Sequence, residues 1–168
     1  MELKEFFLEQ LEREAASSRK TIERVPEGKN AWKPHERSMD LGYLAVMVAT
    51  MPGWVALMID RDELDLDDPS GATFRSKAVE TRRELLRLLD EGLEKSRMAL
   101  QKTTEQHLMK PWRLKMGDEV MAEGPRYVMI TDGALSHLAH HRGQLTVYLR
   151  LMEAKVPAIY GPSADEWH

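Results

Sequence analysis

An uncharged segment of 19 residues, LGYLAVMVATMPGWVALMI, lies between Asp40 and Asp60 and constrains the fold more than any other part of the chain. Its length approaches the roughly 20 residues that a helix needs to cross a bilayer. Pro52 and Gly53 interrupt it, however, and both flanks are acidic rather than basic, which disfavours a membrane span. We therefore expect a helix that ends near Asp60, is bent at Pro52, and is buried within a helix bundle or at a subunit interface.

Three further segments carry apolar residues at helical spacing. They are residues 3–25, a charge-rich stretch from 73 to about 104, and residues 126–153. Between the last two, residues 111–122 alternate around a Met-Gly-Asp turn, which predicts a short β-hairpin. The sequence thus predicts an all-α fold, a four-helix bundle with a short hairpin between its third and fourth helices.

The length and charge of the chain exclude several classes of protein. Its 168 residues correspond to about one domain, so we expect a single domain over residues 1–168. It carries 24 Lys and Arg against 28 Asp and Glu, a formal net charge of −4. Nucleic acids and anionic lipids attract clustered basic residues, so we expect neither nucleic acid nor membrane as a partner. The N-terminal MELKEFFLEQ lacks the continuous apolar stretch of a secretory signal, and we expect a cytoplasmic protein.

The chain has no Cys and six His. The absence of Cys excludes disulfides, thiolate zinc sites and cysteine nucleophiles, and it leaves imidazole as the main reagent near neutral pH. Three of the six, His137, His140 and His141, lie within five positions of the predicted fourth helix. His137 and His141 are one turn apart on nearly the same face, so their rings can share a metal ion. Hydrogen-bonded imidazoles without a metal are the alternative that this spacing leaves open.

Other catalytic motifs are absent from the sequence. No Glu-x-x-His, His-Glu-x-x-His, Gly-x-Ser-x-Gly or phosphate-binding glycine loop occurs. A catalytic zinc or nickel site usually has three protein ligands, and the remaining residues His35, His107 and His168 lie in no ligand motif.

Two motifs resemble a known family. They are WxPxxxSxxLGxLAxxxAxxPGW over Trp32–Trp54, and HxxHHRGQLxxYLR followed by VPxxYGPSADE over His137–Glu166. Together they are similar to the DinB-like superfamily of four-helix bundles, often described as damage-inducible proteins or metal-dependent hydrolases. The resemblance implies a divalent metal, commonly nickel or zinc, and often a homodimer. Thiol-dependent S-transferases and a mycothiol-dependent maleylpyruvate isomerase share the fold.

The resemblance also implies the metal ligands. His137 and His141 match the HxxxH pair of the family's last long helix, and the third ligand is a His in the second helix, within LAxHxA. This chain reads LAVMVA there, so Met47 occupies the position of the third ligand. A thioether is a weak donor for zinc or nickel, although it suits Cu(I). We therefore expect a weakened or absent metal site, with His137 and His141 lining a pocket beneath Met47.

Four further residues are candidates for the site. His140, Arg142 and Gln144 can orient a bound molecule or a His ring, although a surface ion pair is an equally good interpretation of Arg142. Tyr148 lies on nearly the same face as His141, so its hydroxyl can supply a proton, or its ring can pack in the core. Residues 160–166, which include Asp165, can fold over the mouth of the pocket or remain a solvated tail.

Two functions from different classes follow. The first is a metal-dependent hydrolase or transferase that acts on a small molecule. The second is a metal-free bundle that binds a small molecule or a partner helix without catalysis. Met47 favours the second function, and the retained HxxxH pair favours the first. The uncharged second helix suggests a homodimer.

Overall fold

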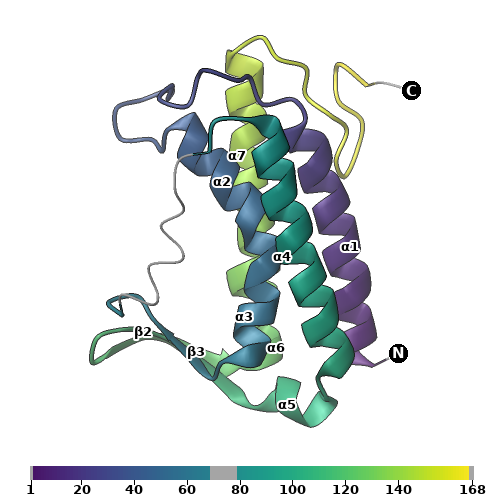
Figure 1. Cartoon of the computed structure of the whole chain (residues 1–168), viewed down its shortest axis with the longest axis vertical. Coiled ribbons are helices and arrows are strands. Elements are labelled where there is room, and N and C mark those ends of the chain that lie inside the picture. Colours follow the sequence, from purple (N-terminus) through teal and green to yellow (C-terminus); the bar gives the residue numbers. More distant parts are fainter. Residues whose placement is uncertain (1, 69–78, 167–168) are drawn as a thin grey trace.

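Four long helical segments lie side by side in the computed structural model of the chain, which describes residues 2–68 and 79–166 (Figure 1). The elements, in chain order, are α1 (Leu3–Ile22), α2 (Leu41–Thr50), the 3₁₀ turn η1 (Met51–Gly53), α3 (Trp54–Asp60), β1 (Glu63–Asp65), α4 (Arg82–Lys102), α5 (Glu105–Met109), β2 (Pro111–Met116), β3 (Glu119–Pro125), α6 (Arg126–Met129), the π-helix η3 (Ile130–Ser136) and α7 (His137–Leu151). The predicted bundle is confirmed: α1, α2–α3, α4 and α6–α7 are its four segments.

The bent second helix is confirmed, and a side chain from α4 holds the bend. Ser96 Oγ donates a hydrogen bond to the Pro52 carbonyl oxygen at 2.7 Å and accepts one from the Ala56 N–H at 3.0 Å. In an unbroken α-helix the Ala56 N–H would donate to the Pro52 carbonyl directly. The hydroxyl therefore lies between two backbone groups of the helix ladder, which is a known cause of helix kinks.

Two glycines let α4 approach this bend. A Cβ atom on Gly92 would lie 3.1 Å from the Gly53 nitrogen and 3.2 Å from the Gly53 Cα. We expect Gly92→Ala to lower the free energy of unfolding by about 1–3 kcal/mol, because backbone would have to move. Gly143→Ala on α7 is the matched control, since its Cβ meets nothing within 4 Å. The control should instead stabilise by roughly 0.5–1 kcal/mol. Urea denaturation of both variants checks this, and equal effects would contradict it.

The apolar second helix is buried by its own chain. The 20 residues from Leu41 to Asp60 are long and apolar enough to span a membrane, but 67% of the most hydropathic window is buried inside the molecule. This is the behaviour of a core helix in a soluble domain. Its apolar character therefore no longer argues for a subunit interface, and the homodimer stays a prediction.

The third helix begins later than expected. It starts at Arg82 rather than 73; residues 73–78 lie outside the described residues, and residues 79–81 are not helical. The reason is a capping box: Thr81 Oγ1 accepts from the Glu84 N–H, and the Glu84 carboxylate accepts from the Thr81 N–H, each at 3.2 Å. This Thr-x-x-Glu signal fixes the start of the helix.

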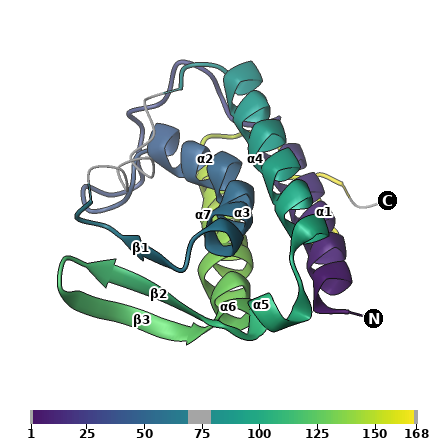
Figure 2. The ribbon, with the colours of Figure 1, turned by 60° about the horizontal axis from the view of Figure 1, so that its bottom comes forward.

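The predicted hairpin is confirmed and belongs to a larger sheet. β2 and β3 pair antiparallel, and β1 adds a parallel strand on the other edge of β2. The Asp65 carboxylate accepts the Gly117 N–H at 2.9 Å, which ties β1 to the hairpin turn. β1 and the short α5 were not predicted. Figure 2 shows the sheet standing to one side of the bundle, beside α3 and α6.

The predicted fourth helix over residues 126–153 is a continuous helical segment that ends at Leu151. Its middle, Ile130–Ser136, is a π-helix. Such wider turns are rare and are often found at functional sites. Here the wider turn ends directly before His137, the first histidine of the predicted site.

Candidate functional site

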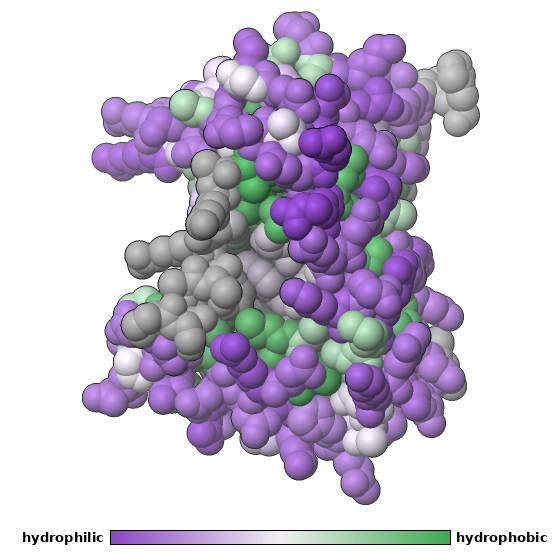
Figure 3. All heavy atoms as spheres, viewed as in Figure 1, coloured by the Kyte–Doolittle hydropathy of each residue, from purple (hydrophilic) through white to green (hydrophobic). Residues whose placement is uncertain are grey.

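A cavity of about 260 Å³ lies between the bent helix, the sheet and the last helical segment. Its lining residues are Tyr43, Met47, Trp54, Leu57, Met58, Leu64, Leu66, Trp112, Leu114, Met129, Gly133 and His137. Apolar side chains reach the surface between the sheet and the helices above it (Figure 3). No charged side chain is among these lining residues.

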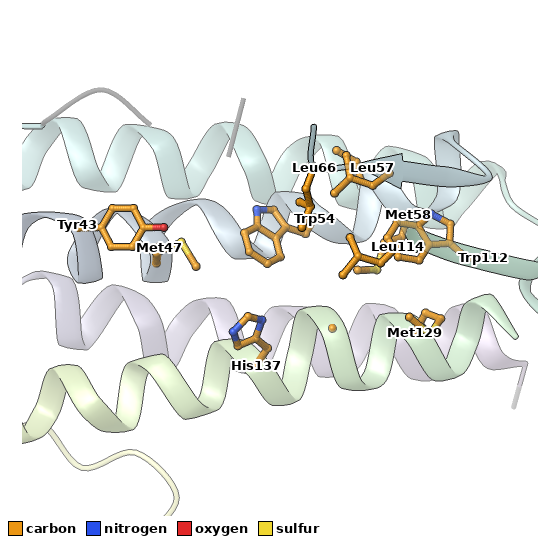
Figure 4. A pocket seen from close by; sticks show the side chains of 12 residues that line it. Tyr43, Met47, Trp54, Leu57, Met58, Leu66, Trp112, Leu114, Met129 and His137 are labelled. Atoms are coloured by element: carbon orange, nitrogen blue, oxygen red, sulfur yellow. The ribbon is translucent and has the colours of Figure 1, made fainter. Parts of the chain in front are cut away.

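His137 lines this cavity with its imidazole ring. The ring faces α2 and α3 from the start of α7 (Figure 4). Its ring packs edge-on against Trp54, with centroids 5.8 Å apart. Burial, helped by the neighbouring His141 and His140 rings, lowers the pKa of His137, and a hydrogen bond to the Gly133 backbone opposes this shift. His137 is therefore neutral at pH 7 and has a lone pair available.

His141 lies beside His137, as the helical spacing predicts. The ring centroids are 4.5 Å apart, and His141 is 5% exposed. Its Nδ1–H donates to the Gln144 amide oxygen at 2.8 Å. This contact holds the proton on Nδ1 and leaves Nε2 free to bind a metal or accept a hydrogen bond. Gln144 thus orients an imidazole, the role for which the sequence made it a candidate.

His140 lies on the outer side of the pair. Its ring contacts His141 edge-on at 5.2 Å, and it is exposed. His140 does not line the cavity. His141 is not among the lining residues either, so the expectation that His137 and His141 both line a pocket beneath Met47 was right for His137 alone.

Met47 faces His137 from the opposite helix. It is 8% exposed and lines the same cavity as His137, and Figure 4 shows its thioether on α2 and the imidazole on α7 facing the space between the helices. Within the described residues, no group of three His, Cys, Asp or Glu side chains is placed to hold a metal. Two imidazoles and a thioether do not fit the three-ligand zinc or nickel site that the resemblance implies.

Arg142 is neither a surface residue nor a neighbour of the cavity. Its side chain is 1% exposed and pairs with the Glu14 carboxylate of α1 at 2.5 Å. It also donates to the Glu14 carbonyl oxygen at 3.0 Å, to Ser18 Oγ at 3.2 Å and to the Tyr160 hydroxyl. Of the two alternatives left open for Arg142, the ion pair is present but buried, because this guanidinium joins α7, α1 and the C-terminal segment in the interior.

Tyr148 also has a structural partner. Its hydroxyl donates to the Met39 carbonyl oxygen at 3.0 Å, and its ring packs edge-on against Trp32 at 5.4 Å. Tyr148 is not among the residues that line the cavity. It fastens the connector before α2 to α7, and its role as a proton donor stays a prediction.

The C-terminal segment lies against α1 and α7, so of the two alternatives left open for residues 160–166 the structure does not support folding over the mouth of the cavity. The Tyr160 hydroxyl donates to the Glu14 carboxylate at 2.8 Å, on the α1 side of the bundle. Asp165 pairs with Arg150 at 2.6 Å, and this guanidinium holds the pKa of Asp165 below its usual value. This hydrogen bond and this ion pair hold the segment against α1 and α7, away from the sheet (Figures 1 and 2).

Several cavity residues were not singled out from the sequence as site residues. Trp112 is 1% exposed, and its indole N–H has no hydrogen-bond partner among the described residues. Met58, Met129 and Gly133 line the cavity from α3, α6 and η3. Apolar residues of this kind carry no motif, so only the packing of the sheet against the bent helix reveals them.

Comparisons with known proteins agree with this fold and with the two sequence motifs. The DinB family pattern matches residues 2–168. The chain belongs to the DinB family. Over 33 residues it is 52% identical to "Uncharacterized protein YrdA" of Bacillus subtilis (strain 168). That stretch covers 20% of this chain and spans only 20% of the length of YrdA.

Solved DinB-like structures share the fold. A DinB-like protein of Bacillus subtilis, YjoA, superposes with a TM-score of 0.66 at 20% identity, over 89% of this chain and 94% of that one. A DinB-like protein of Bacillus cereus superposes with a TM-score of 0.69 at 19% identity, over 93% of this chain and 97% of that one. These structures confirm the DinB-like bundle.

Proposed function

We propose that this DinB family protein binds a compact, uncharged and largely apolar molecule in the cavity, with His137 as a polar contact. The observation that carries the proposal is the lining: one neutral imidazole and the Tyr43 hydroxyl stand among thioethers, leucines and two indoles. Cavities that bind small molecules are mostly apolar and carry a few placed polar groups. An ionised ligand would find no opposite charge among the lining residues, so its burial would cost several kcal/mol.

The alternative function is that of a metal-dependent hydrolase or transferase, as the family resemblance implies. The hydrogen bond from His141 to Gln144 favours it, because ligands of metals are commonly held through their second ring nitrogen. The two imidazoles would need a further donor from a bound molecule or water to complete a divalent site. We rank this function second, because Met47 takes the place of that donor.

Naphthalene and 2-naphthoate form a matched pair of probes for the first proposal, since they differ by one carboxylate. We expect naphthalene to bind and to raise the thermal midpoint, and 2-naphthoate to bind at least about a hundredfold more weakly. Saturation-transfer NMR and thermal denaturation measure both. Tight binding of the anion, or no binding of naphthalene, would contradict the proposal.

Two variants of the hairpin locate the bound probe. Leu114→Trp adds a large side chain to the cavity wall and should abolish naphthalene binding. Val120→Trp makes a comparable change at a position that is 48% exposed and does not line the cavity. This control should bind naphthalene as the unmodified protein does. Equal loss in both variants would place the probe elsewhere.

A further inference from the structure

A second hollow lies between α1, the last helical segment and the C-terminal segment. Its volume is about 200 Å³, below the roughly 300–1,000 Å³ of sites for drug-sized molecules, so it suits a single small ring. Within the described part of the chain, it shares no lining residue with the first cavity. Most of its side chains carry hydrogen-bonding groups; the lining residues are Phe6, Gln10, Glu14, Thr131, Leu135, Ser136, Ala139 and Tyr160.

The carboxylate and the phenol of this second hollow are held in place by a buried cation. Arg142, which is 1% exposed, pairs with the Glu14 carboxylate. The Tyr160 hydroxyl donates to the two Glu14 oxygens at 3.0 and 2.8 Å, and the Arg142 guanidinium lies 5.3 Å from the centroid of the Tyr160 ring. These groups are therefore fixed before any molecule binds, and such preorganisation lowers the entropic cost of binding.

The charges around the second hollow favour an uncharged ligand. Glu14 carries the one formal charge among the lining residues that the structure describes, and Arg142 neutralises it. An anion would meet the carboxylate, and a cation would compete with the buried guanidinium for it. The Gln10 amide and the Ser136 hydroxyl supply further donors and acceptors without charge.

Two aromatic rings add apolar surface beside these polar groups. The Tyr160 side chain is 72% exposed although its hydroxyl is bonded, and Phe6 is 38% exposed. The face of an aromatic ring is partly negative, so it attracts the weakly positive C–H groups of a saturated ring. A sugar ring combines such a C–H face with closely spaced, uncharged hydroxyl groups. The lining of the second hollow matches both properties.

We propose that the second hollow binds one neutral monosaccharide. Its hydroxyls would bond to Gln10, Glu14 and Ser136, and its C–H face would lie against the rings of Tyr160 and Phe6. The proposal is independent of the apolar cavity, because the two sites have different walls and ligands of opposite polarity.

Saturation-transfer NMR on the full-length protein tests this proposal with the methyl glycosides of glucose, galactose and mannose. We expect at least one of the three to bind with a millimolar dissociation constant. The uronic acid and the amino sugar that correspond to the bound glycoside should each bind at least about tenfold more weakly, because each adds a charge. Binding of either charged sugar as tightly as the glycoside would overturn the proposal, and so would no binding of all three glycosides.

A matched pair of variants locates the sugar. Gln10→Leu removes the amide from the second hollow and should weaken glycoside binding at least about fivefold. Gln101→Leu makes the same change at an exposed position of α4 that does not line this hollow, and it should bind as the unmodified protein does. Equal affinities of the two variants would contradict the proposed site. Thermal denaturation of both variants checks that they are folded.

Discussion

Met47→His is expected to turn the site into one that binds zinc or nickel. The new imidazole would face His137, which has the His141 ring beside it, and would add a third nitrogen of the kind that a divalent site requires. Loss of a mere supporting hydrogen bond around a metal ligand costs 10–100-fold in affinity. Gain of a ligand should therefore raise Zn²⁺ affinity by more than about 100-fold. Competition against a chromogenic chelator, followed by elemental analysis of the purified variant, measures this gain.

The gain must depend on the histidine pair. In a His141→Ala background, Met47→His should add little zinc affinity, since only two imidazoles would then be present. Stoichiometric zinc or nickel in the unmodified protein would contradict our interpretation of the site. So would a gain of equal size in the background that lacks His141.

Arg142→Met should lower the free energy of unfolding by about 3–5 kcal/mol, the usual cost of removing one partner from a buried ion pair. The Glu14 side chain is 12% exposed, so its carboxylate would be left buried without its guanidinium partner. Three further contacts, to the Glu14 carbonyl, Ser18 and Tyr160, would be lost as well. Urea denaturation monitored by circular dichroism measures the change.

Two control variants separate the effect of the lost charge on stability from the effect of the lost packing. Arg150→Met removes an exposed ion pair with Asp165 and should cost no more than about 1 kcal/mol. Adding Glu14→Gln to Arg142→Met removes the stranded charge and should restore part of the stability. If the double variant were less stable than the single one, the ion pair would not be the source of the effect.

The bundle was predictable from the sequence because its signals are local. Helical periodicity, the Pro52–Gly53 interruption and the Gly117 turn each specify an element within a few residues. The start of α4 was missed although Thr81 and Glu84 carry a capping signal, because the apolar and charged pattern continues upstream of it. β1 is only three residues long and is defined by pairing with β2, a contact between distant segments.

The candidate site was predictable only in part. The i, i+4 spacing placed His137 and His141 side by side, and the family resemblance drew attention to Met47. The surroundings of Arg142 stayed open, because nothing in its sequence neighbours reveals that Glu14, 128 residues away, lies opposite it. The cavity itself depends on how the sheet stands against α3, which no periodicity encodes.

The π-helix before His137 has a consequence for the shape of the cavity wall. Met129, Gly133 and His137 all line the cavity, at intervals of four residues. In a straight α-helix, positions eight residues apart differ by about 80° in direction, so the first and last would diverge. The wider turn of Ile130–Ser136 takes up this angular drift. The direction of this cavity wall therefore depends on the wider helical turn. Shortening the turn by one residue would rotate Met129 away from the sheet, while His137 and His141 would keep their positions.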